Sequence, residues 1–162
     1  MGIRRPSHPH PSMPIPSVYR CADPGGRMST ETLTYADVVA GVQASLAAYT
    51  QAMDSGRFDD VLATFSSDAV FEIPNFGVVA EGHDAIREYY ATTTGGAPLR
   101  HVVVNTLVSD QKEGEVEVSS DLLVLQKGDA GWGLIMVGKY QDILRSVSGA
   151  WLFQRRTLSF AI

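Results

Sequence analysis

Residues 49–62, YTQAMDSGRFDDVL, form the corner around which the N-terminal half of this chain is organised. Gly56 suits the left-handed residue that follows a helix end, so the stretch predicts one helix ending, a tight turn and a second helix starting. Asp54 stands in or near the last turn of the first helix. A carboxylate there faces the negative end of the helix dipole, which disfavours it by a few tenths to about 1 kcal/mol. The position raises the question of what compensates this acid.

The sequence on both sides of this corner predicts three helices. Apolar residues recur at helical intervals through residues 34–54, and again through the shorter segment 57–65. Between the second and third helices, residues 69–74 (AVFEIP) predict a short strand that ends at proline, and residues 75–82 supply a turn and another extended piece. Gly82 then opens the third helix, with Asp84 in its favourable first turn.

Everything after Pro98 predicts strand. Four β-rich segments, residues 99–111, 114–128, 131–146 and 149–162, are separated by glycine-containing turns typical of hairpins. They should form an antiparallel meander. Helices first and strands afterwards is the α+β pattern. We expect a curved antiparallel sheet that curls into a cone, with three helices packed on its concave face and an apolar cavity between the two layers.

Composition narrows the class of protein. The chain has 162 residues and a formal net charge of -5, which fits one domain and gives no electrostatic reason to bind nucleic acid. No apolar run approaches the roughly 20 residues of a membrane helix. A single cysteine, Cys21, excludes an internal disulfide and, with no secretory h-region, predicts a cytoplasmic protein.

The first 27 residues differ from the rest. They hold six of the eight prolines and four arginines, and they cannot supply a core, so we expect a disordered or loosely packed tail over residues 1–27 and a domain over residues 28–162. Met28 is an alternative start. His8 and His10 in this tail make a weak ligand set, and no group of His, Cys and acidic residues elsewhere has metal-ligand spacing, so no metal is predicted.

His101 begins the first of the four long strands. Alternation places His101, Val103, Asn105 and Leu107 on one face, and Val102, Val104, Thr106 and Val108 on the other. Both faces carry many apolar residues, so both should be covered, one by helices and one by a partner subunit. A covered histidine needs a hydrogen-bond partner. His101 is either a core residue whose hydrogen bonds are all made within the fold or a catalytic group.

Asp54 and Tyr49 each have an ordinary alternative. Asp54 can close an Asx-type turn over Gly56 or help to start the second helix. Tyr49 can be a core aromatic residue whose hydroxyl reaches a rim.

Weaker polar candidates lie on the later strands. Tyr140 and Asp142 share a strand face. Arg155 and Arg156 point to opposite faces, so at most one enters the interior unless a bulge intervenes. The residues that we expect to contact a ligand in the cavity are Phe58, Phe76, Asn105, Asp121 and Tyr140.

The motifs together resemble the SnoaL-like branch of the nuclear-transport-factor-2-like superfamily. They are AYTQAMDSGRFDDVLATFSSDAVFE, GHDAIREYY, RHVVVN, GKYQDIL and GAWLFQRR, and the resemblance runs from about Thr34 to the C-terminus. It implies the cone-shaped α+β fold and a homodimer. This fold hosts dehydratases, isomerases, cyclases, epoxide hydrolases and non-catalytic modules, so the resemblance leaves the activity open.

Two dehydratases within the superfamily suggest roles for residues. Bile-acid 7α-dehydratases use a tyrosine, an aspartate and a histidine, and Tyr49, Asp54 and His101 stand at the matching positions. Scytalone dehydratase uses a second histidine on the following strand, where this chain has Asp121 instead. The resemblance therefore implies a cofactor-independent acid–base enzyme acting on a small apolar carbonyl compound such as a polyketide, steroid or terpenoid. The alternatives are a small-ligand-binding or dimerisation module without chemistry, and a structural subunit of a larger oxygenase.

Overall fold

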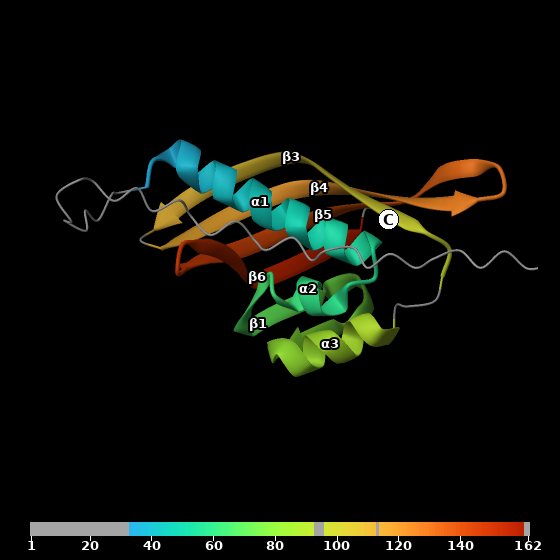
Figure 1. The fold of residues 1–162 in the computed structure, drawn as a ribbon, viewed down its shortest axis with the longest axis horizontal. Coiled ribbons are helices and arrows are strands. Elements are labelled where there is room, and N and C mark those ends of the chain that lie inside the picture. The colour runs from blue at the N-terminus through green and yellow to red at the C-terminus, as the bar shows by residue number, and fades with distance from the viewer. Residues whose placement is uncertain (1–32, 93–95, 113, 161–162) are drawn as a thin grey trace, which may run out of the picture.

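The computed structural model describes residues 33–92, 96–112 and 114–160, so the proline-rich segment 1–27, Cys21 and Met28 lie outside the described residues. Three helices pack against a six-stranded sheet (Figure 1). Helix α1 lies across the long strands, while α2 and α3 lie over β1. The predicted α+β class is confirmed.

The sheet is mixed and open. Its order is β2-β1-β6-β5-β4-β3, and every neighbouring pair is antiparallel except β1 with β6, which is parallel. The four C-terminal strands form the expected antiparallel meander. The strands are β1 Phe65–Ile73, β2 Val78–Glu81, β3 Leu99–Lys112, β4 Glu115–Gly128, β5 Gly131–Val147 and β6 Ala150–Phe160.

Helix α1, Tyr35–Asp54, begins at a capping box in which Thr34 and Asp37 satisfy each other's backbone N–H groups. Its apolar stripe faces the sheet and is buried, and Gly56, with φ +65°, turns the chain into α2, Phe58–Leu62. Helix α3, Gly82–Thr92, follows the β1–β2 pair. Among the described helices none is long and apolar enough to cross a membrane. The buried stripe of α1 is Val38, Val42, Leu46, Tyr49 and Ala52.

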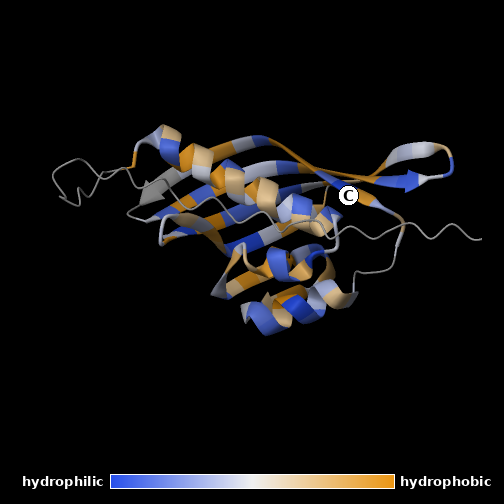
Figure 2. Ribbon diagram, in the orientation of Figure 1, coloured by the Kyte–Doolittle hydropathy of each residue, from blue (hydrophilic) through white to orange (hydrophobic). Residues whose placement is uncertain are grey.

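The core lies between α1 and the inner face of the long strands. Apolar and polar positions alternate along these strands, as Figure 2 shows. On β4, for example, Val116, Val118 and Leu122 are buried while their sequence neighbours are more exposed. One face of the sheet is therefore packed against helices, and the other is open in this single chain.

A β-bulge in β3 overturns the predicted faces of that strand. Val104 pairs with Asp121 and Leu107 with Ser119, so β3 has one more residue than β4 between these two pairs. Asn105 takes up the extra residue with φ +51°, a conformation that asparagine tolerates better than most residues. Beyond the bulge the alternation is reversed. Val108 is therefore buried on the inner face, and Leu107 is exposed on the outer face, opposite to the prediction.

A second bulge decides which arginine of β6 enters the core. Ile143 pairs with Arg155 and Leu144 with Phe153, which leaves Gln154 as the extra residue. Phe153 and Arg156 both point inward as a result, while Arg155 lies on the surface and pairs with Glu72 at 2.6 Å. The sequence prediction that at most one of the two arginines is internal is confirmed.

Helix α1 packs at Gly41 directly against the Trp151 side chain of β6. A Cβ placed on Gly41 would overlap the indole of Trp151, whose Nε1 would lie 2.9 Å away. Ser45, one turn later, donates a hydrogen bond to the main-chain carbonyl of Trp151. These two contacts fix the distance between α1 and the sheet.

Gly41→Ala should therefore destabilise the protein, although alanine favours helices by about 1 kcal/mol over glycine. Overpacking a buried indole costs typically about 1–3 kcal/mol, and the overlap here is severe, so we expect a net loss of about 1–2 kcal/mol in urea unfolding. Gly133→Ala is the control, because nothing lies within 4 Å of its added Cβ. Equal effects of the two substitutions would contradict the close approach.

Candidate active site

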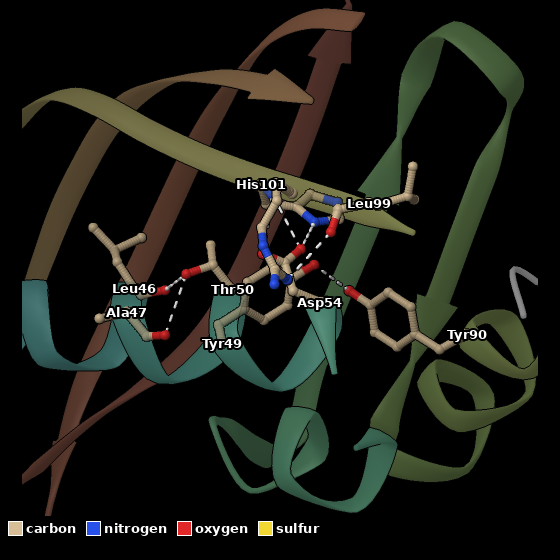
Figure 3. Close-up of polar contacts among 9 residues, drawn as sticks. Leu46, Ala47, Tyr49, Thr50, Asp54, Tyr90, Leu99 and His101 are labelled. Atoms are coloured by element: carbon tan, nitrogen blue, oxygen red, sulfur yellow. Dashed lines mark hydrogen bonds and ion pairs between the residues drawn. The ribbon is translucent and has the colours of Figure 1, made fainter. Parts of the chain in front are cut away.

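Asp54 is the last residue of α1, and its carboxylate is held by the beginning of β3. Oδ1 accepts from the backbone N–H of His101 at 3.0 Å and from its ring Nδ1 at 2.7 Å, and Oδ2 lies 3.3 Å from the same backbone nitrogen. Arg100 Nη1 lies 3.6 Å from Oδ2. Figure 3 shows the two side chains facing each other at the helix end. The two N–H donors of His101 and the positive charge of Arg100 compensate for the unfavourable position of the acid on the helix dipole.

The hydrogen bond to Asp54 fixes how the His101 ring is protonated. A carboxylate only accepts hydrogen bonds, so Nδ1 must donate, and in the neutral ring Nε2 then carries the lone pair. Within the part of the chain that the structure describes, Nε2 makes no hydrogen bond. The side chains of His101 and Asp54 are 12% and 9% exposed, so the pair is shielded but not sealed. Their predicted proximity across 47 positions is confirmed.

Tyr49 points from α1 into the core rather than to the Asp54–His101 pair. Its hydroxyl lies 2.7 Å from the hydroxyl of Tyr90 on α3, and both residues are 2% exposed (Figure 3). The ring of Tyr49 makes edge contacts with Phe65, Tyr140 and Phe153. Among the described residues, no hydrogen bond joins Tyr49 to Asp54 or His101. A substrate would have to bridge them.

A buried ion pair lies beneath Tyr49. Asp142 accepts two hydrogen bonds from Arg156, at 2.9 Å from Nε and 2.7 Å from Nη2, and both side chains are fully buried. The rings of Tyr49, Tyr140 and Phe153 lie 3.9–4.2 Å from the guanidinium carbon, a cation–π arrangement. The pair therefore ties β5 to β6 and also supports the tyrosine above it.

Burial controls the ionisation of this interior. It raises the pKa of the Asp142 carboxyl, and the neighbouring Arg156 opposes that rise. Burial by itself would lower the pKa of Arg156, but Asp142, together with Tyr140 and Tyr49, more than offsets this and the pKa is raised. We take both groups as charged, because each oxygen of Asp142 receives a short charge-assisted bond. Burial also raises the pKa values of Tyr90 and Tyr140 well above 10, so both stay protonated phenols.

Two of the predicted ligand-contact residues join this interior. Tyr140 is 1% exposed and stacks on Arg156 beside Tyr49. Phe58, on α2, is half-buried and stacks on Tyr90 with ring centroids 6.4 Å apart. Tyr140 therefore contacts Tyr49 directly, and Phe58 reaches it through Tyr90.

Three other predicted residues are placed elsewhere, which corrects the expectation that they line the cavity. Asn105 and Asp121 lie on the outer face, where they bond to each other at 2.8 Å, because the bulge rotates Asn105 outward and Asp121 follows the buried Ser120. Phe76 is 69% exposed in the short helix η1, Pro74–Phe76, and packs on Phe160. It belongs to the sheet edge opposite to the one that carries His101.

A surface groove of about 540 Å³ lies beside the site. It lies between the corner after α1 and helix α3, and it begins two residues after Asp54. Inside the fold, by contrast, aromatic rings fill the space between Tyr49 and the sheet. The apolar cavity expected between helices and sheet is thus filled by aromatic side chains around Tyr49. The groove is lined by Gly56, Arg57, Phe58, Asp59, Asp60, Arg87 and Ala91.

Sequence reasoning missed Tyr90 as a partner of Tyr49. Helical spacing buries Tyr90 rather than Tyr89, since it follows the buried Ile86 by four positions, but no sequence pattern places its hydroxyl against another helix. The Asp142–Arg156 pair left a clearer signal. Asp142 interrupts the apolar alternation of β5 between Tyr140 and Leu144, and a buried acid calls for a cation.

Comparisons with known proteins agree with this fold. The family model described as SnoaL-like domain matches residues 34–157. No curated protein matches the chain. Among solved structures, Aln2 from a Streptomyces species is 25% identical with a TM-score of 0.72, over 80% of this chain and 94% of that one.

Two further solved structures are similar to the same extent. The "Putative Scytalone Dehydratase" from Novosphingobium aromaticivorans is 25% identical with a TM-score of 0.67, over 77% of this chain and 85% of that one. A function-unknown protein from Mycobacterium tuberculosis is 25% identical with a TM-score of 0.70, over 76% of this chain and 72% of that one.

Removing one partner of the buried ion pair should be costly. Asp142→Ala leaves the Arg156 charge unpaired in the core, and we expect the free energy of unfolding to fall by about 3–5 kcal/mol. The matched control is Glu72→Ala, which breaks the surface pair with Arg155 and should cost about 0–1 kcal/mol. Chemical denaturation of both variants measures the difference. Similar losses would mean that the two pairs are equally solvated.

Proposed function

The chain belongs to the SnoaL-like domain family, and on that premise we propose that it is a cofactor-independent acid–base enzyme. The reaction is a dehydration, isomerisation or cyclisation of a small apolar carbonyl compound, of the kind that polyketides, steroids and terpenoids provide. The proposed catalytic residues are Tyr49, Asp54 and His101. Phe58 and Tyr140 are the proposed substrate contacts. The fold supports such chemistry but also hosts other functions, so the proposal depends on the site.

The observation that carries the proposal is the orientation of the His101 ring. Asp54 binds Nδ1 at 2.7 Å, and Nε2 remains available as a base in the neutral ring. A carboxylate on one ring nitrogen raises the basicity of the other and stabilises the imidazolium that forms.

The proposed dehydration moves one proton through His101. Nε2 takes the proton from the carbon next to the substrate carbonyl, and the C–H electrons form an enolate. The enolate then expels the β-hydroxyl, which leaves as water with the proton returned from Nε2, and the C=C bond forms. Tyr49 donates a hydrogen bond to the carbonyl oxygen while negative charge builds up there. The atoms balance without a cofactor.

A second candidate function is ligand binding without chemistry. It is favoured by the backbone hydrogen bond from His101 to Asp54, which pins α1 to β3 whether or not the ring reacts. The filled interior next to Tyr49 favours it as well. In that case Asp54 and His101 are a structural pair, and the small ligand occupies the groove at Phe58.

We also propose that two copies pair through the outer face of the sheet. Val102, Val104 and Leu107 on β3 are 37%, 36% and 59% exposed, and Val137 on β5 continues the same face through Leu123. A contiguous apolar surface of this kind is seldom left open on a soluble protein. Val108, expected in this interface from sequence, is buried inside and plays no part.

Enone formation from a panel of β-hydroxy ketones tests the catalytic proposal. Asp54→Asn and His101→Ala should each lower turnover by about 10²–10⁴-fold while circular dichroism shows a folded protein. Glu115→Gln, which alters an acid that pairs with Arg145 outside the groove, is the matched control and should leave turnover unchanged. Wild-type protein that binds members of the panel but converts none would favour the binding module instead.

Sedimentation tests the dimer. We expect a species of twice 17.5 kDa at micromolar concentration, and Leu107→Asp should convert it to monomer by placing a charge in the buried interface. Val79→Asp changes an equally exposed apolar residue on β2, at the far part of the sheet, and should leave the dimer intact. A monomeric wild type would contradict the proposal.

A further inference from the structure

Two tyrosine hydroxyls meet in the core where α1 and α3 converge. The oxygen of Tyr90 lies 2.7 Å from that of Tyr49, and either atom can be the donor (Figure 3). The two residues are 41 positions apart, so this contact exists only in the folded protein. It lies on the α3 side of Tyr49, whereas Asp54 and His101 lie at the end of α1.

The ring of Tyr90 cannot easily move away from this contact. It stacks with Phe58 at 6.4 Å with an interplanar angle of 16°, and it packs on Phe71 and Tyr89 at centroid distances of 5.4 Å. Rings that pack on several sides leave the hydroxyl rotor as the main remaining freedom. The position of the Tyr90 oxygen is therefore fixed, while its proton can turn.

Tyr90 also keeps its proton. Burial raises the pKa of its hydroxyl well above 10, and the neighbouring Tyr49 adds to this rise. The side chain is a neutral phenol across the whole physiological range, able to donate as well as accept.

We infer that Tyr90 is a positioning residue of the candidate site, which donates a hydrogen bond to the Tyr49 oxygen while Tyr49 donates its own hydrogen bond to the substrate carbonyl oxygen. The inference rests on the proposed function. A hydroxyl that accepts a hydrogen bond becomes a stronger donor, because each bond polarises the next in a low-dielectric interior. Tyr140, on β5, is a second side-chain hydrogen-bond partner of Tyr49, so Tyr90 is the partner that the helices supply.

The adjacent Tyr89 provides a matched control. Its ring packs on Phe71 at 5.1 Å and on Tyr90, but within the described residues its hydroxyl makes no hydrogen bond. Tyr89→Phe and Tyr90→Phe remove the same atom from neighbouring positions of one helix. Only the second removes a hydroxyl that bonds to Tyr49.

Proton NMR of the hydroxyl groups tests the contact itself, independently of any substrate. A buried hydroxyl proton in a short bond exchanges slowly and gives a downfield resonance. We expect this resonance in wild type and in Tyr89→Phe, and its loss in both Tyr49→Phe and Tyr90→Phe. A resonance that persists in Tyr90→Phe would overturn the inference.

Kinetics on a β-hydroxy ketone that the wild type converts test the role. Tyr90→Phe should lower kcat by about 3- to 10-fold, the effect of one hydrogen bond, with KM changed less than about twofold. The double variant with Tyr49→Phe should be no slower than Tyr49→Phe alone, because Tyr90 acts through Tyr49. Losses that multiply in the double variant, or a change in KM alone, would overturn the role.

These outcomes separate the two proposals. If the hydroxyl resonance is present in wild type and lost in Tyr90→Phe, but no panel member is converted, the proposed function is overturned and the positioning role with it. The hydrogen bond between the two hydroxyls then still stands. Conversion that depends on His101 but not on Tyr90 overturns the positioning role alone.

Discussion

The carboxylate of Asp54 is the constraint on which the arrangement of α1 and the long strands depends. It sits at the end of a helix dipole that disfavours it, and two N–H donors of His101 and the charge of Arg100 compensate. Because one of these donors is a backbone N–H, the carboxylate fixes the start of β3 as well as a side chain. With Gly41 and Trp151 in contact in the N-terminal half of α1, the helix is held at two points along its length. A shift of α1 along the sheet would break both.

The interior beneath α1 combines charge with aromatic rings. Arg156 and Asp142 are fully buried. Burying two ions is costly unless they bond to each other with good geometry, and the two short hydrogen bonds of this pair provide it. Rings of Tyr49, Tyr140 and Phe153 surround the cation instead of water. Tyr49 packs on Tyr140 of β5 and Phe153 of β6, and its hydroxyl bonds to Tyr90 of α3. The direction of this hydroxyl therefore depends on both strands and on α3. Such a polar core limits how the helices can repack.

The catalytic and structural interpretations of Asp54 and His101 use different atoms of the same residues. The backbone N–H bond serves the fold and needs no imidazole, whereas the Nδ1 bond orients a ring whose second nitrogen has no partner among the described residues. A ring 12% exposed is reachable by a small molecule and shielded enough for electrostatic effects to be strong. The fold alone does not decide between them, because members of one fold acquire activity through their sites.

Sequence by itself determined the order and type of the elements, because helical and alternating hydrophobic periods are local properties of the chain. It also singled out Asp54, since an acid at a helix end conflicts with the local electrostatics, and the family resemblance paired it with His101. The tertiary structure alone decided which residues face inward beyond the bulges of β3 and β6. Bulges at Asn105 and Gln154 each insert one residue and reverse the alternation, and no periodicity within the strand predicts them, because they depend on the register of the neighbouring strand. The Tyr49–Tyr90 contact likewise required the packing of two helices that the sequence keeps far apart.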